Sequence, residues 1–128
     1  MKKVVALLLA VAMMLSMTAC RIVIDGEEGS TAAKVDGSVG LAVSTQNNPF
    51  FVTLVEGAKA EAAKLGVDLQ VTDAGDDAAK QTTDIETLVA SGISVLIVNP
   101  VDSDAVAGAV QSAISAGVKV ISVDRAVN

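Results

Sequence analysis

Polar side chains and a pair of phenylalanines follow short apolar runs at several points of the chain. The set comprises Ser44, Asn48, Phe50, Phe51, Asn99, Asp124 and Arg125. Amides, carboxylates and a guanidinium group together suit hydroxyl groups, because each hydroxyl both donates and accepts a hydrogen bond. Small-molecule pockets combine apolar walls with a few placed polar groups, and a phenyl face suits the apolar face of a ring. The set therefore predicts binding of a neutral polyol such as a sugar rather than covalent chemistry.

Apart from Ser44, these residues also have purely structural interpretations. Asn48 and Asn99 each precede a proline, so the first is a candidate helix N-cap and the second a candidate turn residue. Asp124 and Arg125 also suit a solvated surface pair. The two phenylalanines are neighbours on a predicted helix, about 100° apart, so one of them also suits the core. The functional interpretation depends on whether the fold brings the whole set to one place.

The elements that must position this set alternate between strand and helix. Apolar runs predict strands, and apolar spacings of three and four residues predict helices that end at glycines. Strands are predicted at 38–44, 67–72, 95–98 and 118–123, and helices are predicted between them at 49–65, 77–91 and 104–116. Ser103 is the expected N-cap of the third helix.

Strand–helix–strand repeats at this spacing pair in parallel through right-handed crossovers. The predicted fold class is therefore α/β, an open doubly wound parallel sheet with strand order 2-1-3-4. Ligands of such sheets bind outside the carboxyl ends of the strands. Ser44 ends the first predicted strand and the other members of the set follow strands, so this fold predicts that the whole set shares one edge of the sheet.

The composition excludes several kinds of site. The chain has no histidine and one cysteine, Cys20, which excludes a zinc site of His and Cys ligands, a disulfide within the chain and a catalytic triad with histidine. The turn after the first strand, at 44–51, lacks the glycines of a dinucleotide site. We therefore expect a binding protein with no metal, no cofactor and no enzyme activity.

The charge of the chain argues against polyanionic ligands. The net charge of −6 includes Lys2 and Lys3, and the chain from Arg21 onward has 7 basic residues (9 − 2) and 15 acidic residues, which gives −8. An acidic domain without clustered Lys and Arg does not suit nucleic acid. We expect a small neutral ligand and no nucleic-acid partner.

The first twenty residues have the pattern of an export signal. Two lysines precede an apolar run, and small residues then lead to Cys20; the run is shorter than the ~20 residues of a spanning helix. The pattern resembles a bacterial lipobox, whose cysteine receives lipid. Residues 1–20 are interpreted as a lipoprotein signal peptide and 21–36 as a flexible tether. The alternatives are an uncleaved anchor and a classical signal with an incidental cysteine.

Three motifs occur together over residues 44–125. They are Ser44-Thr45-x-Asn47-Asn48-Pro49-Phe50-Phe51, Asn99-Pro100-Val101-Asp102-Ser103-Asp104-Ala105-Val106 and Asp124-Arg125. Their combination resembles the ribose-binding protein family, the type I periplasmic sugar receptors of ABC transporters. The resemblance implies that sugar hydroxyls and the ring oxygen are bonded by Asn48, Asn99, Asp124 and Arg125. It also implies that Phe50 and Phe51 pack on the ring and that Ser44 is a peripheral polar contact.

The resemblance further implies a location, a ligand and partners. We expect an extracytoplasmic lipoprotein that is anchored to the outer face of the cell membrane. Its expected ligand is a monosaccharide, most of all D-ribose, which is taken up through an ABC-transporter permease. A chemoreceptor or sensor is a second expected partner. Members of this family have two lobes, so 37–128 is expected to be a partial amino-terminal lobe of a truncated chain or fragment. The alternatives are a surface interaction or sensor component, and a non-functional remnant without the second lobe.

Overall fold

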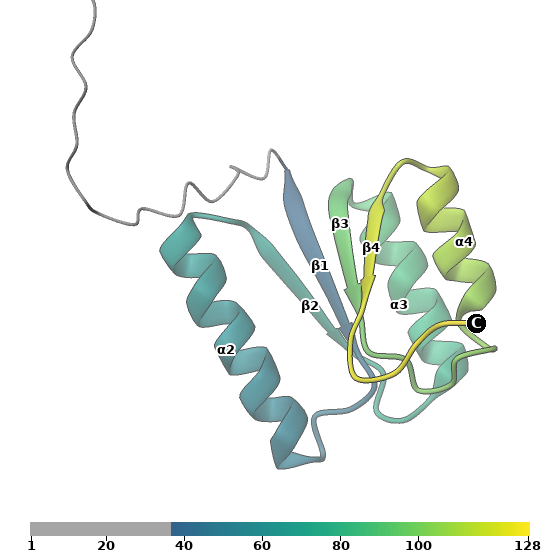
Figure 1. Ribbon diagram of the computed structural model, residues 1–128, viewed down its shortest axis with the longest axis horizontal. Helices are drawn as coiled ribbons and strands as arrows, with labels where there is room; N and C mark the ends of the chain where they lie inside the picture. The colour runs from purple at the N-terminus through teal and green to yellow at the C-terminus, as the bar shows by residue number, and fades with distance from the viewer. Residues whose placement is uncertain (1–36) are drawn as a thin grey trace, which may run out of the picture. The chain divides into compact units, whose positions relative to one another are not determined.

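The computed structural model describes residues 37–128, in which strands and helices alternate along the chain (Figure 1). The elements are β1 (Ser38–Val43), α2 (Pro49–Leu65), β2 (Leu69–Asp73), α3 (Ala78–Ala90), β3 (Ile93–Val98), α4 (Ala107–Ser115) and β4 (Lys119–Ser122). Within this part of the chain, none of the helices combines the length and the apolar character needed to cross a membrane. The predicted signal peptide, Cys20 and tether lie outside the described residues.

The four strands of the described region form one parallel sheet in the order β2-β1-β3-β4. This confirms the predicted fold class and strand order. The strands end nearly level with one another, because Val43 lies opposite Asp73, and Val98 lies opposite both Ala42 and Ser122. The loops that follow the strands therefore meet at one edge of the sheet (Figure 1).

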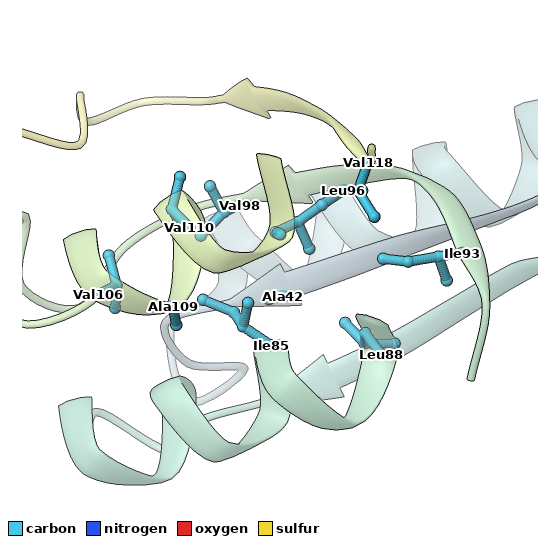
Figure 2. Packing of buried hydrophobic residues seen from close by; sticks show 11 residues of the cluster. Ala42, Ile85, Leu88, Ile93, Leu96, Val98, Val106, Ala109, Val110 and Val118 are labelled. Atoms are coloured by element: carbon cyan, nitrogen blue, oxygen red, sulfur yellow. The ribbon is translucent and has the colours of Figure 1, made fainter. Parts of the chain in front are cut away.

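Helices cover the two faces of the sheet unequally. Leu41 and Val43 of β1 face α2 and pack with Val55, whereas Ala42 between them packs in the larger cluster on the opposite face. That larger cluster draws on α3 and α4 (Figure 2). Because both faces of β1 are covered, the strand is apolar at consecutive positions rather than at alternate ones.

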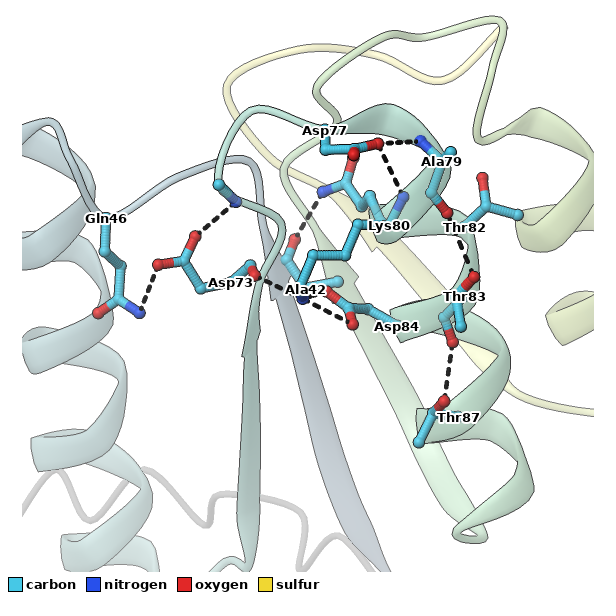
Figure 3. Close-up of polar contacts among 12 residues, drawn as sticks. Ala42, Gln46, Asp73, Asp77, Ala79, Lys80, Thr82, Thr83, Asp84 and Thr87 are labelled. Carbon is cyan, nitrogen blue, oxygen red and sulfur yellow. Dashed lines mark hydrogen bonds and ion pairs between the residues drawn. The ribbon is translucent and has the colours of Figure 1, made fainter.

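Polar side chains set the starts of two helices. Asn48 Oδ1 accepts a hydrogen bond from the Phe50 amide at 3.0 Å, and the proline that follows Asn48 suits a first helical position because its missing N–H is not needed there. Asp77 Oδ1 accepts from the Ala79 and Lys80 amides at 2.9 and 3.0 Å (Figure 3). The Asn48 cap agrees with the structural interpretation of that residue, and α2 has the predicted bounds.

The predicted start of the third helix is wrong. The helix α4 begins at Ala107, and Ser103 is not its cap, because its hydroxyl donates to the Ala126 carbonyl instead. Asp102 Oδ1 accepts from the Asp104 and Ala105 amides at 3.0 and 2.8 Å. An aspartate that bonds the amides just ahead of it stabilises a turn in competition with a helix, so the chain turns here before α4 begins.

Candidate functional site

The side chain of Asn99 joins the ends of three strands. It is 1% exposed, and its Oδ1 accepts from the Ser44 amide at 3.2 Å and from the Ser44 hydroxyl at 2.6 Å. Its Nδ2 donates to the Val123 carbonyl at 3.4 Å and to Asp124 Oδ2 at 3.3 Å. An amide side chain accepts two bonds and donates two, so the capacity of Asn99 is fully used within the chain.

Asp124 and Arg125 lie in a tight turn directly after β4. The Arg125 amide donates to the Val123 carbonyl at 2.7 Å, and Asp124 between them has φ 65°. Left-handed backbone at a residue other than glycine is strained, and such residues concentrate where a side chain must be held in place. The Asp124 carboxylate is exposed, so the turn presents acceptors to solvent while Asn99 holds one of its oxygens.

The Arg125 side chain folds back over the loop that follows β3. Its Nη1 donates to the Val101 carbonyl, and the residue is exposed. A guanidinium group has five N–H donors, so one bond to Val101 leaves most of them available. Arg125 therefore presents donors over the loop that follows β3, and Asp124, the residue before it, presents acceptors.

The two phenylalanines stand at the first turn of α2. Phe50 is 59% exposed and Phe51 is half-buried; their ring centroids are 5.2 Å apart and the rings meet edge to face at 79°. Neither ring belongs to the buried clusters. Asn48 caps this turn through Oδ1 alone, which leaves its exposed amide nitrogen as a donor next to the rings.

The loop from Ser44 to Asn48 fixes the phenylalanines relative to Asn99. The Ser44 carbonyl accepts from the Asp76 amide at 2.8 Å, and Gln46 Nε2 donates to Asp73 Oδ2 at 3.4 Å (Figure 3). The loop is therefore held by the turn after β2. We name the resulting surface the polar edge, which consists of Ser44, Asn48, Phe50, Phe51, Asn99, Asp124 and Arg125.

The polar edge contains two groups rather than one network. Hydrogen bonds join Ser44, Asn99 and Asp124, whereas within residues 37–128 none joins Asn48 to Asn99 or Asp124. Both groups nevertheless follow the carboxyl ends of strands at the same side of the sheet. The edge thus offers a wall of donors and acceptors and a separate apolar wall.

A groove elsewhere on the described surface has different chemistry. A groove of about 310 Å³ lies between α2 and the sheet. It is lined by Val39, Ala58, Glu61, Ala62, Leu65, Val67, Leu69 and Ile97. The carboxylate of Glu61 already pairs with Lys64 at 3.1 Å, so the groove has little with which to bind hydroxyls. Of the two surfaces, the polar edge suits a polyol.

Sequence reasoning missed Gln81. This residue of α3 is 0% exposed, its Nε2 donates to the Asn99 carbonyl at 2.8 Å, and its Oε1 accepts from the Val101 amide at 2.7 Å. The available signal was its position, because Gln81, Ile85 and Leu88 share the inward face of α3 at spacings of four and three. A glutamine on an apolar stripe needs buried partners, and the nearest strand end supplies them.

Comparisons with known proteins place this arrangement in a family. Residues 39–128 match the periplasmic binding protein domain family. The chain belongs to this family. Over 127 residues it is 41% identical to the ribose import binding protein of Bacillus subtilis, an alignment that covers 98% of this chain and 41% of that protein. It is 45% identical to the ribose import binding protein of Escherichia coli over 96 residues, which cover 75% of this chain and 32% of that protein.

The solved structures agree with the sequence relatives. The myo-inositol binding protein of Caulobacter, determined with myo-inositol bound, superimposes with a TM-score of 0.69 at 41% identity, over 72% of this chain and 31% of that one. The predicted resemblance to ribose-binding periplasmic proteins is thereby confirmed. The chain spans less than half the length of each of these relatives, and the relatives are solute-binding proteins by name.

Proposed function

We propose that the polar edge binds a monosaccharide and that D-ribose is the favoured ligand. This binding is the first step of import through an ABC transporter. The observation that supports this most strongly is the strained, exposed Asp124, which the buried Asn99 holds through a hydrogen bond. The Asp124 carboxylate can accept from a sugar hydroxyl, and the exposed Arg125 guanidinium group, on the next residue, can donate to one. The names of two relatives, both ribose import binding proteins, supply the ligand class.

Each member of the polar edge has a separate part in this proposal. Asp124 accepts from sugar hydroxyls, and Arg125 donates to hydroxyls or to the ring oxygen. The exposed ring of Phe50, with Phe51 behind it, covers the apolar face of the sugar, and the free amide nitrogen of Asn48 donates beside them. Ser44 is a peripheral member that anchors Asn99 at 2.6 Å.

Asn99 contacts the sugar in this proposal only by exchanging a bond that it already makes. The two bonds to Ser44 are within the normal range, whereas the bonds from Nδ2, at 3.3 and 3.4 Å, are longer than the usual 2.7–3.2 Å. A sugar hydroxyl that replaces one of these long bonds costs the chain little. Asn99 therefore acts both as a support for Asp124 and as a donor to the ligand.

Choice among sugars is a separate part of the proposal. The Caulobacter relative binds myo-inositol, so this fold accepts polyols of more than one shape. Ribose is favoured because of the identity to the two ribose import proteins over most of the described residues. Calorimetry of the chain with D-ribose, D-glucose and myo-inositol tests the choice, and the proposal is wrong in this part if another sugar binds more tightly.

The organisation of the chain completes the proposal. Residues 1–20 act as the signal peptide, and Cys20 carries the lipid. Residues 21–36 tether a partial amino-terminal lobe, 37–128, to the outer face of the membrane. The partners there are a permease and a chemoreceptor or sensor. Cells fed an alkyne-labelled fatty acid should label the chain but not its Cys20→Ser variant. Equal labelling of both would contradict the anchor.

The binding proposal is tested by paired substitutions. Asp124→Ala removes the exposed carboxylate, and Lys64→Ala removes an exposed charge at the opposite end of α2. Loss of a charged hydrogen-bond partner is worth about 1.5–3 kcal/mol, so ribose affinity should fall by roughly tenfold or more in Asp124→Ala. Lys64→Ala should bind ribose as the unmodified chain does. Equal affinities of Asp124→Ala and the unmodified chain would refute the assignment.

A further inference from the structure

We propose that Gln81, buried behind the polar edge, is a positioning residue for sugar binding that acts through Asn99 and Arg125. The inference rests on the proposed function, because it concerns the same edge. Gln81 itself does not reach the surface: it is 0% exposed and belongs to α3. Its influence on a ligand therefore passes through the residues that it holds.

The first step is the turn that carries Asn99. The sheet ladder reaches the Asn99 amide, which donates to the Ala42 carbonyl at 2.9 Å, and the strand β3 ends at Val98. Beyond this point Pro100 has no N–H to offer. The groups left to satisfy are the Asn99 carbonyl and the Val101 amide, and a buried backbone group without a partner is destabilising.

Gln81 satisfies both groups with one side chain. Its Nε2 donates to the Asn99 carbonyl at 2.8 Å, and its Oε1 accepts from the Val101 amide at 2.7 Å. A primary amide has a donor and an acceptor on one plane, so it occupies the place of a neighbouring peptide group. The Asn99-Pro100-Val101 turn is thus clamped at both ends from the helix side.

The second step leads from this turn to the ligand groups. At one end of the turn the Asn99 side chain holds Asp124 Oδ2 at 3.3 Å. At the other end the Val101 carbonyl accepts from Arg125 Nη1. A shift of the turn therefore moves the supports of Asp124 and Arg125 together, and these are the acceptor and the donor of the proposed site.

The chemistry of the clamp explains why the residue is a glutamine. Methionine has nearly the same length and fits an apolar stripe, but it has neither the donor nor the acceptor. Glutamate keeps an acceptor for Val101, yet places an oxygen against the Asn99 carbonyl. Only the amide serves both groups without charge in a buried position.

Gln81→Met tests the clamp, with Ile85→Ala as the matched control. Ile85 is also 0% exposed and lies one turn further along α3, but it packs in the core cluster and does not bond the edge. We expect ribose affinity to fall by about tenfold in folded Gln81→Met, the size of losing a hydrogen bond to a positioned group. Ile85→Ala should lower the melting temperature at least as much as Gln81→Met does, and it should leave the ribose affinity of the folded chain unchanged.

A spectroscopic measurement without sugar separates positioning from general stability. The side-chain NH2 signals of Asn99 and the amide signals of Asp124 and Arg125 should shift or broaden in Gln81→Met and stay in place in Ile85→Ala. Unchanged signals in folded Gln81→Met would overturn the proposal, and so would unchanged ribose affinity. If Gln81→Met does not fold, hydrogen exchange of the unmodified chain decides: the Val101 amide should exchange as slowly as those of β3, and fast exchange would overturn the clamp.

The two proposals fail in different ways. If the unmodified chain binds no sugar, the proposed function fails, while the Asn99 signals still decide whether Gln81 clamps the turn. If the unmodified chain binds ribose and Gln81→Met binds it equally well, the positioning role fails and the proposed function stands.

Discussion

The substitution Asn99→Ala tests how far the polar edge depends on one buried amide. It removes the acceptor for the Ser44 amide and hydroxyl and the donor for Val123 and Asp124. Only the Ser44 bonds, at 3.2 and 2.6 Å, fall within or near the range of good hydrogen bonds. The stability effect should therefore come mainly from Ser44.

The magnitude follows from what the substitution leaves behind. Ser44 is 7% exposed, so its amide loses its partner in a place that water scarcely reaches. An unsatisfied buried group costs about 1–3 kcal/mol and the lost hydroxyl bond about 1 kcal/mol. Asp124 is exposed and exchanges its bond for water at little cost. We expect Asn99→Ala to lower the free energy of unfolding by about 2–4 kcal/mol.

Urea unfolding followed by far-ultraviolet circular dichroism measures this loss, because the chain has no Trp or Tyr for fluorescence. With a slope of about 1–2 kcal/mol/M for a small domain, the midpoint should fall by roughly 1 M or more. Ser44→Ala, which removes one of the bonds, should lose about 1 kcal/mol. The double variant should lose less than the two single losses added together, because they share a hydrogen bond.

Two results would refute this reasoning. The first is a loss below about 1 kcal/mol in Asn99→Ala, which is less than one orphaned buried group should cost. The second is strict additivity of Asn99→Ala and Ser44→Ala, which would mean that the 2.6 Å bond between them contributes nothing to folding.

Three further substitutions test other parts of the account. Gly40→Ala should lower the free energy of unfolding by about 1–3 kcal/mol in the same urea assay. The reason is that the added Cβ would lie 2.8 Å from Ile93 Cδ1 and 3.1 Å from Leu88 Cδ1. An unchanged midpoint would contradict this packing. Asp124→Gly should be more stable than Asp124→Ala by about 1–2 kcal/mol, since only glycine adopts φ 65° without strain, and equal stabilities would contradict a left-handed turn. Phe50→Ala should weaken ribose binding in calorimetry by roughly tenfold while leaving stability nearly unchanged, because the ring is 59% exposed; a large loss of stability would instead place the ring in the core.

The sheet was predictable from the sequence because each of its elements has a local signal. The helix α2 begins at Pro49 after a capping asparagine and ends at Leu65, and the φ of 67° at Gly66, which follows, suits glycine. The burial of both faces makes each central strand a continuous apolar run. Parallel pairing then followed from the alternation of strand and helix, and it brought the predicted site residues to one edge.

The details of the edge were not predictable, because they depend on contacts between distant segments. Asn99 bonds Ser44, which lies 55 positions away, and no local pattern indicates that its amide is saturated within the chain. The place of Gln81 on the apolar stripe of α3 indicates that its amide needs buried partners, but not that these partners come from the end of β3. The start of α4 was misplaced because Asp102, rather than Ser103, bonds the free amides.

Sugar binding at the polar edge is measured residue by residue when amide chemical shifts are mapped during a titration with D-ribose. We expect saturable shifts that are confined to 44–51, 99–101 and 123–125, and we expect them to be lost in Asp124→Ala. Absence of saturable shifts at millimolar ribose would contradict this expectation. So would shifts centred on the apolar groove, at Ala58, Leu65 and Leu69.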